Sequence, residues 1–225
     1  MNIQLFLRLV CLCCLVQFIS CSSPQSSSQE QVGEEQEVGE KVKTILFFGN
    51  SLTAGYGIDP EFSFAGRVQS RLDSLKQEFK VINGGLSGET SAGGLSRLDW
   101  FLEEEPYIFI LELGGNDGLR GIALSETKKN LLSIIDKVYA KYPNTKIVLA
   151  GMQIPPNMGQ EYTNGFKAIY PEIAKEKNVT LIPFLLEGVA GDPNLNLPDG
   201  IHPTEEGHRI VFETLWPYLE ELLKS

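Results

Sequence analysis

A serine stands among small residues directly after an apolar run, in the stretch FFGNSLTAGYG (47–57). In such a position Ser51 is usually a turn residue or a helix cap. A serine hydroxyl becomes a nucleophile only when a base removes its proton, and the chain has two histidines. His202 lies three residues after Asp199, which could hold the second ring nitrogen and stabilise the imidazolium. Ser51, His202 and Asp199 together have the chemistry of a catalytic triad for acyl transfer.

Acyl transfer also needs preorganised donors for the oxyanion of the tetrahedral intermediate. The backbone N–H groups of Ser51 and Gly88 and the side-chain amide of Asn116 are donors of the required kind. Glycine and asparagine also have a simpler interpretation as turn residues, and GGLSG (84–88) could be read as a phosphate loop. That stretch lacks the GxGxxG spacing and a Walker lysine, so it indicates phosphate binding only weakly. The absence of a GxSxG elbow argues against an α/β-hydrolase of the usual kind.

Five apolar runs suited to buried strands alternate with segments of helical spacing. The runs cover 44–49, 80–83, 107–114, 146–151 and 179–183. This alternation predicts a five-stranded parallel sheet with helices on both faces, a three-layer α/β/α domain. Sites in such sheets form beyond the carboxyl ends of the strands. We therefore expect one shared edge for the small and polar residues that follow the five runs, namely 49–51, 84–90, 114–117, 152–159 and 197–204.

Apolar residues at helical spacing predict the helices. Three stripes stand out: Val68, Leu72, Leu75 and Phe79; Leu131, Ile134, Ile135 and Val138; and Phe166, Ile169, Tyr170 and Ile173. A last segment, 210–223, contains Pro217, which should kink or end a helix. We interpret His208, just before that segment, as an ordinary surface residue.

Composition excludes several classes of protein. A chain of 225 residues with 42% hydrophobic content can bury one full core, and no internal repeat or second domain is evident. The formal net charge of −10, without a Lys/Arg cluster, argues against a nucleic-acid surface. All four cysteines fall in the first 21 residues, and no histidine lies near CLCC (11–14) to complete a metal site.

The first 21 residues are typical of a secreted lipoprotein. The apolar stretch LFLRLVCLCCLVQFIS (5–20), with Arg8 near its start, fits the core of a signal peptide better than a transmembrane helix. FISC resembles a bacterial lipobox, with Phe18 where leucine is usual. Cleavage before Cys21 would leave this cysteine as the lipidated N-terminus, whereas an uncleaved anchor helix would give nearly the same topology.

The next residues, 22–43, are rich in Ser, Gln and Glu and nearly free of apolar side chains. Such a segment cannot offset its ordering entropy by burial, so we expect a disordered tether. The predicted organisation is therefore a lipoprotein signal peptide over 1–20, a lipidated cysteine and tether over 21–43, and a folded domain over 44–225.

Four stretches together resemble the blocks of the SGNH (GDSL) hydrolase superfamily, in the same order and spacing. They are GNSLTAGYG with Ser51, NGGLSGET with Gly88, ELGGNDGLRG with Asn116, and DGIHPT with Asp199 and His202. LTAGYG, ELGGNDGLRG and YPEIAKEKNVTLIPF are more specifically similar to the bacterial arylesterase, acyl-CoA thioesterase I and lysophospholipase branch. The resemblance implies a flavodoxin-like three-layer fold, no metal or other cofactor, and hydrolysis through an acyl-serine intermediate.

The resemblance also places an acyl-binding groove beside the loop after the fourth strand. Ile154, Pro155, Pro156 and Met158 are apolar enough to line it, although the same residues could serve only to pack the loop.

One residue departs from the family pattern. The family usually reads GDS, whereas this chain reads GNS, with Asn50 before the serine. Asparagine is nearly isosteric with aspartate and still accepts a hydrogen bond, but it carries no negative charge. We expect the turn to keep its geometry, and the local electrostatics and the pH profile to change.

The leading hypothesis is a lipid-anchored, extracytoplasmic serine esterase that cleaves acyl esters or thioesters, with lysophospholipids among the candidate substrates. We expect a monomer that meets the membrane through its anchor and binds no nucleic acid. Such a location disfavours acyl-CoA, which is expected in the cytoplasm. The alternatives are a carbohydrate O-acetyl esterase, a non-catalytic surface lipoprotein that only binds a ligand, and, from the fold alone, a flavin-binding flavodoxin.

Overall fold

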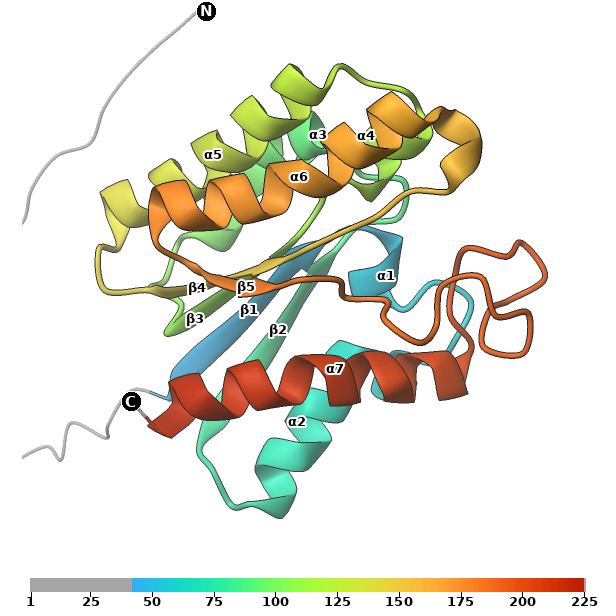
Figure 1. Ribbon diagram of the computed structural model, residues 1–225. Coiled ribbons are helices and arrows are strands. Elements are labelled where there is room, and N and C mark those ends of the chain that lie inside the picture. The colour runs from blue at the N-terminus through green and yellow to red at the C-terminus, as the bar shows by residue number, and fades with distance from the viewer. Residues whose placement is uncertain (1–41, 225) are drawn as a thin grey trace, which may run out of the picture. The chain divides into compact units, whose positions relative to one another are not determined.

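Five parallel strands form one sheet in the order β2-β1-β3-β4-β5, with helices on both faces (Figure 1). The computed structural model describes residues 42–224, so the predicted signal peptide, Cys21 and nearly all of the predicted tether lie outside the described residues. The strands are β1 (Lys43–Gly49), β2 (Phe79–Gly85), β3 (Ile108–Glu112), β4 (Lys146–Ala150) and β5 (Thr180–Ile182). The predicted three-layer α/β fold is confirmed, and its first strand begins one residue earlier than expected.

Strand β1 is hydrogen-bonded on both sides, to β2 and to the central strand β3. Ile45 pairs with Val81 of β2 on one side and with Ile108 of β3 on the other. Its residues 45–48 are at most 1% exposed, because helices cover both faces of the sheet. The apolar run that identified this strand in the sequence is therefore the middle of the hydrophobic core.

The helices divide between the two faces of the sheet. In Figure 1, α2 and α7 lie together on one face, and α5 and α6 lie side by side on the other, with α3 next to α5. The α-helices are α1 (Ser51–Ala54), α2 (Phe64–Ser74), α3 (Ser91–Arg97), α4 (Gly115–Leu119), α5 (Leu124–Lys141), α6 (Gln160–Lys177) and α7 (Glu205–Lys224). Short 3-10 turns are η1 (Pro60–Phe62), η2 (Leu98–Phe101) and η3 (Pro156–Met158). In the described part of the chain, no helix is both long and apolar enough to span a membrane.

The predicted stripe from Val68 to Phe79 is wrong in its second half. Val68 and Leu72 are fully buried in α2, but the helix ends at Ser74 and Leu75 is 43% exposed. Lys76 then takes a left-handed conformation with φ of 55°, which turns the chain into the edge strand β2. Phe79 therefore belongs to β2.

Pro217 does not end the last helix, which was one of the two effects expected of it. The helix α7 continues through it to Lys224. Pro217 lies on the exposed face of α7, where water can reach the carbonyl of Glu213 that lacks its N–H partner.

His208 is not a surface residue, so the prediction from sequence was wrong there as well. It is 1% exposed, its ring stacks on Phe64 at 5.8 Å between centroids, and its Nδ1 accepts a hydrogen bond of 3.3 Å from the Phe64 N–H. The imidazole thereby joins α7 to the first residue of α2. Burial, with the Arg67 charge nearby, lowers the pKa of His208 to about 4.

This buried histidine predicts a specific loss of stability in acid. The folded state binds the proton with a pKa of about 4 and the unfolded state near the ordinary 6.5, so stability present above pH 6.5 is lost as pH falls toward 4. Between pH 7 and 5 the wild type should lose about 2 kcal/mol more than His208→Asn, which keeps an acceptor for the Phe64 N–H. Urea unfolding of both proteins at pH 7 and pH 5 measures the change in the free energy of unfolding. The contributions of all other titrating groups cancel when the two changes are compared, because both proteins contain them. Equal losses in the two proteins would contradict it.

Candidate active site

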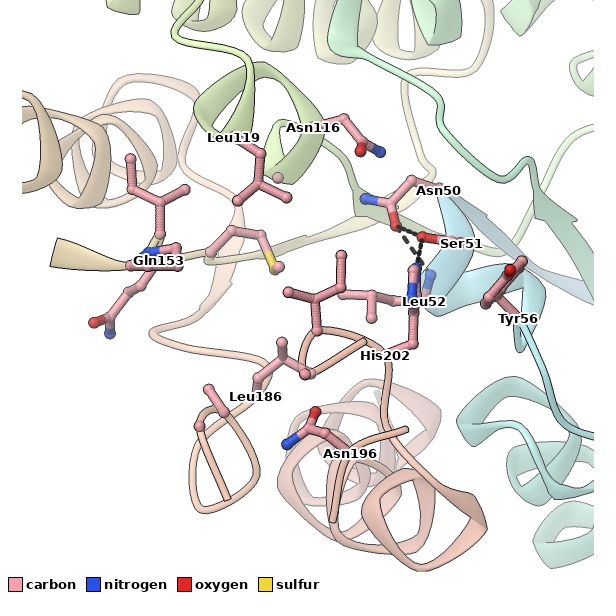
Figure 2. A pocket seen from close by; sticks show the side chains of 18 of the residues that line it. Asn50, Ser51, Leu52, Tyr56, Asn116, Leu119, Gln153, Leu186, Asn196 and His202 are labelled. Atoms are coloured by element: carbon pink, nitrogen blue, oxygen red, sulfur yellow. Dashed lines mark hydrogen bonds between the residues drawn. The ribbon is translucent and has the colours of Figure 1, made fainter. Parts of the chain in front are cut away.

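All five polar segments that follow the strands contribute to one cavity of about 690 Å³ (Figure 2). The strand order 2-1-3-4-5 reverses direction between β1 and β3, and a crevice is expected at that switch point. Ser51 follows β1 and Asn116 lies just beyond β3, while His202 comes from the loop that precedes α7. The sheet topology therefore brings together side chains that are far apart in the sequence.

The three residues expected to form a triad lie within hydrogen-bonding distance of one another. The Ser51 Oγ and His202 Nε2 atoms are 2.8 Å apart, and His202 Nδ1 is 2.8 Å from Asp199 Oδ2. Ser51 is 7% exposed, and the side chain of His202 is 16% exposed. The hydroxyl can thus give its proton to an imidazole whose other nitrogen faces a carboxylate.

The structure of the turn that carries Ser51 explains the role of the asparagine before it. Asn50 is the N-cap of α1, and its Oδ1 accepts a hydrogen bond of 3.0 Å from the Leu52 N–H. Gly49 is needed before it because a Cβ there would come within 2.1 Å of Thr53 Oγ1 and 2.6 Å of Glu112 Oε2. The cap and this close approach fix the turn so that Ser51 lines the cavity.

Asp199 is prepared to act as the carboxylate partner of the imidazole. Its Oδ1 accepts the backbone N–H groups of Ile201 and His202, each at 3.0 Å, while its Oδ2 faces the ring. The Ile201 N–H and then the His202 ring lower the pKa of Asp199 to about 2. The carboxyl group therefore stays ionised in neutral solution.

Two of the groups expected to be oxyanion donors are held in place by their neighbours. Gly88 has a φ of 78°, which glycine adopts without strain, and its carbonyl accepts a hydrogen bond of 2.9 Å from Arg120 Nη2. The Asn116 Nδ2 donates to the Glu89 carbonyl at 2.9 Å, which leaves its second amide hydrogen for the cavity. Ser51, Gly88 and Asn116 all line the cavity.

A family model described as the GDSL-like Lipase/Acylhydrolase family matches residues 47–210. The chain belongs to this family. It is 40% identical to the Esterase TesA of Pseudomonas aeruginosa over 80% of this chain and 90% of the relative. It is 35% identical to the Thioesterase 1/protease 1/lysophospholipase L1 of Escherichia coli, over 80% of this chain and 85% of the relative.

Solved structures agree with these relatives. A crystal structure of TesA superposes with a TM-score of 0.76 at 40% identity, covering 80% of this chain and 99% of that one. The psychrotrophic esterase EstA from Pseudoalteromonas, inhibited by monoethylphosphonate, also gives a TM-score of 0.76, at 33% identity over 81% of this chain and all of that one. The protein is therefore a serine ester hydrolase of the GDSL (SGNH) family, which works through an acyl-serine intermediate.

The wall of this GDSL hydrolase's cavity contains three of the four predicted groove residues. Ile154, Pro155 and Pro156 line it, whereas Met158 is absent from the lining and packs against the hydrophobic core. Further apolar lining comes from residues that the sequence did not single out: Leu52, Leu119, Met152, Phe184, Leu186, Ala190 and Ile201. Among the described residues, no group of three or more His, Cys, Asp or Glu side chains is placed to hold a metal ion.

Two residues of the GDSL hydrolase site escaped the sequence reasoning. The Tyr56 ring lies 4.5 Å from the His202 ring, centroid to centroid, and limits how the imidazole can rotate. Glu112 is 1% exposed and accepts four hydrogen bonds from Asn50 and Thr53. Both residues lie in stretches that resemble the family blocks, Tyr56 in GNSLTAGYG and Glu112 in ELGGNDGLRG, but neither was given a role. Glu112 had a further signal, because a single carboxylate ends an otherwise apolar strand.

Loss of the Asn116 amide should reduce turnover. Removing one preorganised oxyanion donor typically costs about 10²–10³ in kcat, so Asn116→Ala should lose activity by roughly that factor with a small change in KM. The measurement is steady-state hydrolysis of a p-nitrophenyl ester. Asn130→Ala is the matched control, because that amide donates to Ser91 Oγ and is not part of the cavity lining. A kcat for Asn116→Ala within threefold of the control would contradict this role.

Proposed function

We propose that this esterase is a lipid-anchored, extracytoplasmic enzyme that hydrolyses esters of long, apolar acyl chains, lysophospholipids among them. The observation that carries the substrate class is the apolar cavity beside Ser51. The anchor and location rest on the sequence of residues 1–21. In this proposal Ser51 is the nucleophile, His202 the base and Asp199 its partner.

Each of these groups has a defined role in the reaction. The Ser51 oxygen attacks the acyl carbonyl carbon, and the serine proton passes to His202 Nε2, 2.8 Å away. The negative charge on the carbonyl oxygen is met by the N–H groups of Ser51 and Gly88 and by the Asn116 amide. His202 returns the proton to the leaving alcohol as the C–O bond breaks. A water molecule then attacks the carbonyl carbon of the acyl-serine and gives a proton to His202. The bond between that carbon and Ser51 Oγ breaks, His202 returns the proton to the serine oxygen, and the carboxylic acid leaves.

The shape and chemistry of the cavity support an acyl chain as its occupant. Buried Met152, Ile154 and Leu186 form an apolar wall that an alkyl chain can cover without leaving polar groups unpaired. Tyr56 and Ile201, which are 50% and 44% exposed, continue this apolar surface to the rim. The name of the Escherichia coli relative includes thioesterase and lysophospholipase, and both of these activities cleave an acyl group from its carrier.

Acyl-chain length is the direct test of the substrate class. With p-nitrophenyl esters from acetate to palmitate, kcat/KM should rise with chain length, and Ser51→Ala should abolish turnover. Ala190→Trp, which fills the cavity from its lip, should lower kcat/KM for palmitate about tenfold or more and leave acetate nearly unchanged. Ala140→Trp, an exposed position near the end of α5, serves as the control.

Other outcomes separate the alternatives. A preference for acetate, together with release of acetate from acetylated sugars, would support a carbohydrate O-acetyl esterase instead. Affinity for acyl ligands without turnover would support a binding module, and turnover that survives Ser51→Ala would overturn the proposed mechanism.

Lipidation predicts a different experiment on the full chain. In a bacterial host grown with labelled palmitate, the wild type should carry the label and sediment with membranes. Cys21→Ser should carry none, because the thiol that accepts the lipid is gone. Cys14→Ser, in the same apolar segment, is the matched control and should keep the label. Label on Cys21→Ser, or an unlabelled wild type, would disprove the anchor.

A further inference from the structure

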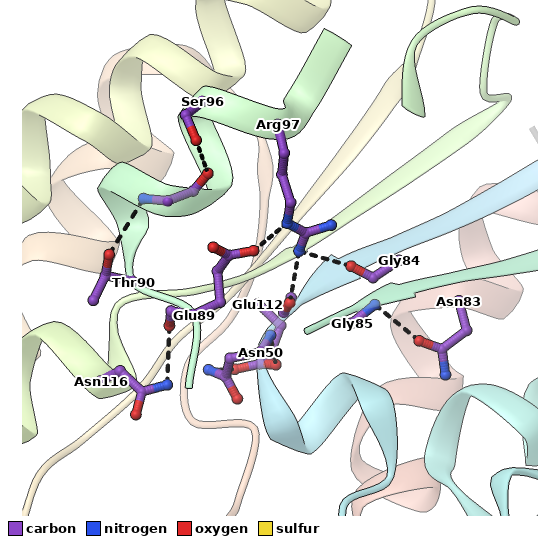
Figure 3. Close-up of polar contacts among 12 residues, drawn as sticks. Asn50, Asn83, Gly84, Gly85, Glu89, Thr90, Ser96, Arg97, Glu112 and Asn116 are labelled. Carbon is purple, nitrogen blue, oxygen red and sulfur yellow. Dashed lines mark hydrogen bonds and ion pairs between the residues drawn. The ribbon is translucent and has the colours of Figure 1, made fainter. Parts of the chain in front are cut away.

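The carboxylate of Glu112 binds the turn that carries the nucleophile, and it does so with both of its oxygens (Figure 3). Oε1 accepts the Asn50 Nδ2 at 2.6 Å. Oε2 accepts the Asn50 N–H at 3.1 Å, the Thr53 N–H at 3.3 Å and the Thr53 hydroxyl at 2.8 Å. These donors flank Ser51 on either side, so one side chain of β3 fixes the position of the serine.

All four of these hydrogen bonds can form together only when the acid carries no proton. A hydrogen on Oε1 would point at the Asn50 amide hydrogens, and one on Oε2 would require the Thr53 hydroxyl to turn and accept it instead of donating. Rotation of the Asn50 amide by half a turn would remove the clash at Oε1. It would also place Nδ2 against the Leu52 N–H, which now donates to Asn50 Oδ1. The arrangement therefore requires an ionised carboxylate.

An aspartate at position 50, as in the sequence for which the GDSL family is named, would have to be held differently. Its second oxygen would lie about where Nδ2 now lies, 2.6 Å from Glu112 Oε1. Two carboxylates at that distance cannot both be ionised and must share a proton. The asparagine of this chain replaces that shared proton with a permanent N–H donor.

We propose that Asn50 and Glu112 are a positioning pair for Ser51, in which the amide lets the buried carboxylate hold the nucleophile turn while ionised and without a shared proton. Protonation of Glu112 removes at least one of the four hydrogen bonds that hold the turn, whereas at alkaline pH the Asn50 amide has no proton to lose. The inference rests on Ser51 being the nucleophile, as proposed above.

Other charged and titratable groups surround the pair. Tyr170 on α6 has a pKa raised well above its usual value, chiefly by burial and next by the Glu112 charge. Arg97 on α3 donates to the carbonyl of Gly49, next to Asn50, and pairs with Glu89. Asp117 on α4 acts on the same Tyr170, and His202 is hydrogen-bonded to Ser51. Burial also raises the pKa of Glu112 itself to about 7, because desolvation outweighs the hydrogen bonds from Thr53 and Asn50. All these groups remain in the variants at position 50, so differences in pH profile report the pair.

The test is a set of isosteric variants measured from pH 5 to 10 with one ester substrate in a pH-stat. Asn50→Asp should acquire an alkaline limb that the wild type lacks, with kcat/KM falling about tenfold per pH unit above the apparent pKa of the acid pair. Asn144→Asp, exposed in the turn before β4, is the matched control and should keep the wild-type profile. An unchanged profile for Asn50→Asp overturns the inference.

Two further variants distinguish positioning from bulk structure. In Glu112→Gln, an amide NH2 group replaces one carboxylate oxygen and faces N–H donors from which it cannot accept a hydrogen bond. The turn should shift, and kcat should fall by about 10²-fold, because a small misplacement of the nucleophile has that cost. The double variant Asn50→Asp/Glu112→Gln reverses the direction of the hydrogen bond and should recover kcat to within about tenfold of the wild type, without the alkaline limb. The inference requires the double variant to fold and turn over, so an unfolded or inactive double variant also overturns it. Retained activity in Ser51→Ala would instead overturn the mechanism.

Discussion

The hydrogen bonds between the carboxylate at the end of β3 and the turn after β1 are the constraint on which the active edge depends. Glu112 and Gly49 occupy paired positions of the two neighbouring strands, so the register of the sheet sets the distance between the acid and the turn. Only a residue without a side chain at position 49 lets the carboxylate reach past the strand end. The position of Ser51 is thus a property of the sheet and depends little on loop flexibility.

The oxyanion side of the site is tied to the same strands by a second buried charge. The Arg97 guanidinium pairs with Glu89 and donates to the carbonyls of Gly49 and Gly84, at 3.1 and 2.9 Å (Figure 3). It also lies 4.3 Å from the centre of the Phe48 ring and 5.1 Å from that of the Phe101 ring. Because Glu89 directly follows Gly88, this ion pair fixes the oxyanion loop against the carboxyl ends of β1 and β2.

The parts of this enzyme that were predictable from sequence are those determined by local pattern. Apolar runs marked the strands, and the rule that sites follow the carboxyl ends of parallel strands placed Ser51, Asn116 and His202 at one edge. Long-range contacts decided the rest. His208 reads as a polar helix residue, and its burial comes from an α2 residue 144 positions away. Met158 has the right chemistry for an acyl groove, but residue type does not show which way a side chain turns.

Similarly, the end of α2 was missed because apolar spacing continues past Ser74 while the chain must turn into an edge strand. Glu112 illustrates the opposite limit. A buried carboxylate can be noticed in an apolar run, but its partners follow only from the register that pairs β1 with β3. The sequence pattern therefore predicts which residue types form the site, whereas the pairing of the strands determines which of these residues are in contact.

The proposed base His202 and its carboxylate partner Asp199 share one small loop, whereas the proposed nucleophile Ser51 lies in the turn after β1. Asp199 and His202 are three residues apart, and the loop closes on itself through the Leu197 N–H and His202 carbonyl at 2.7 Å. The serine, in contrast, is 151 residues from the histidine. Asp199 and His202 can therefore pair within a short segment of chain. Activity requires this segment to pack against the folded sheet, because the sheet positions Ser51. For a refolding molecule, the return of activity marks the contact between two residues that are 151 positions apart in the chain.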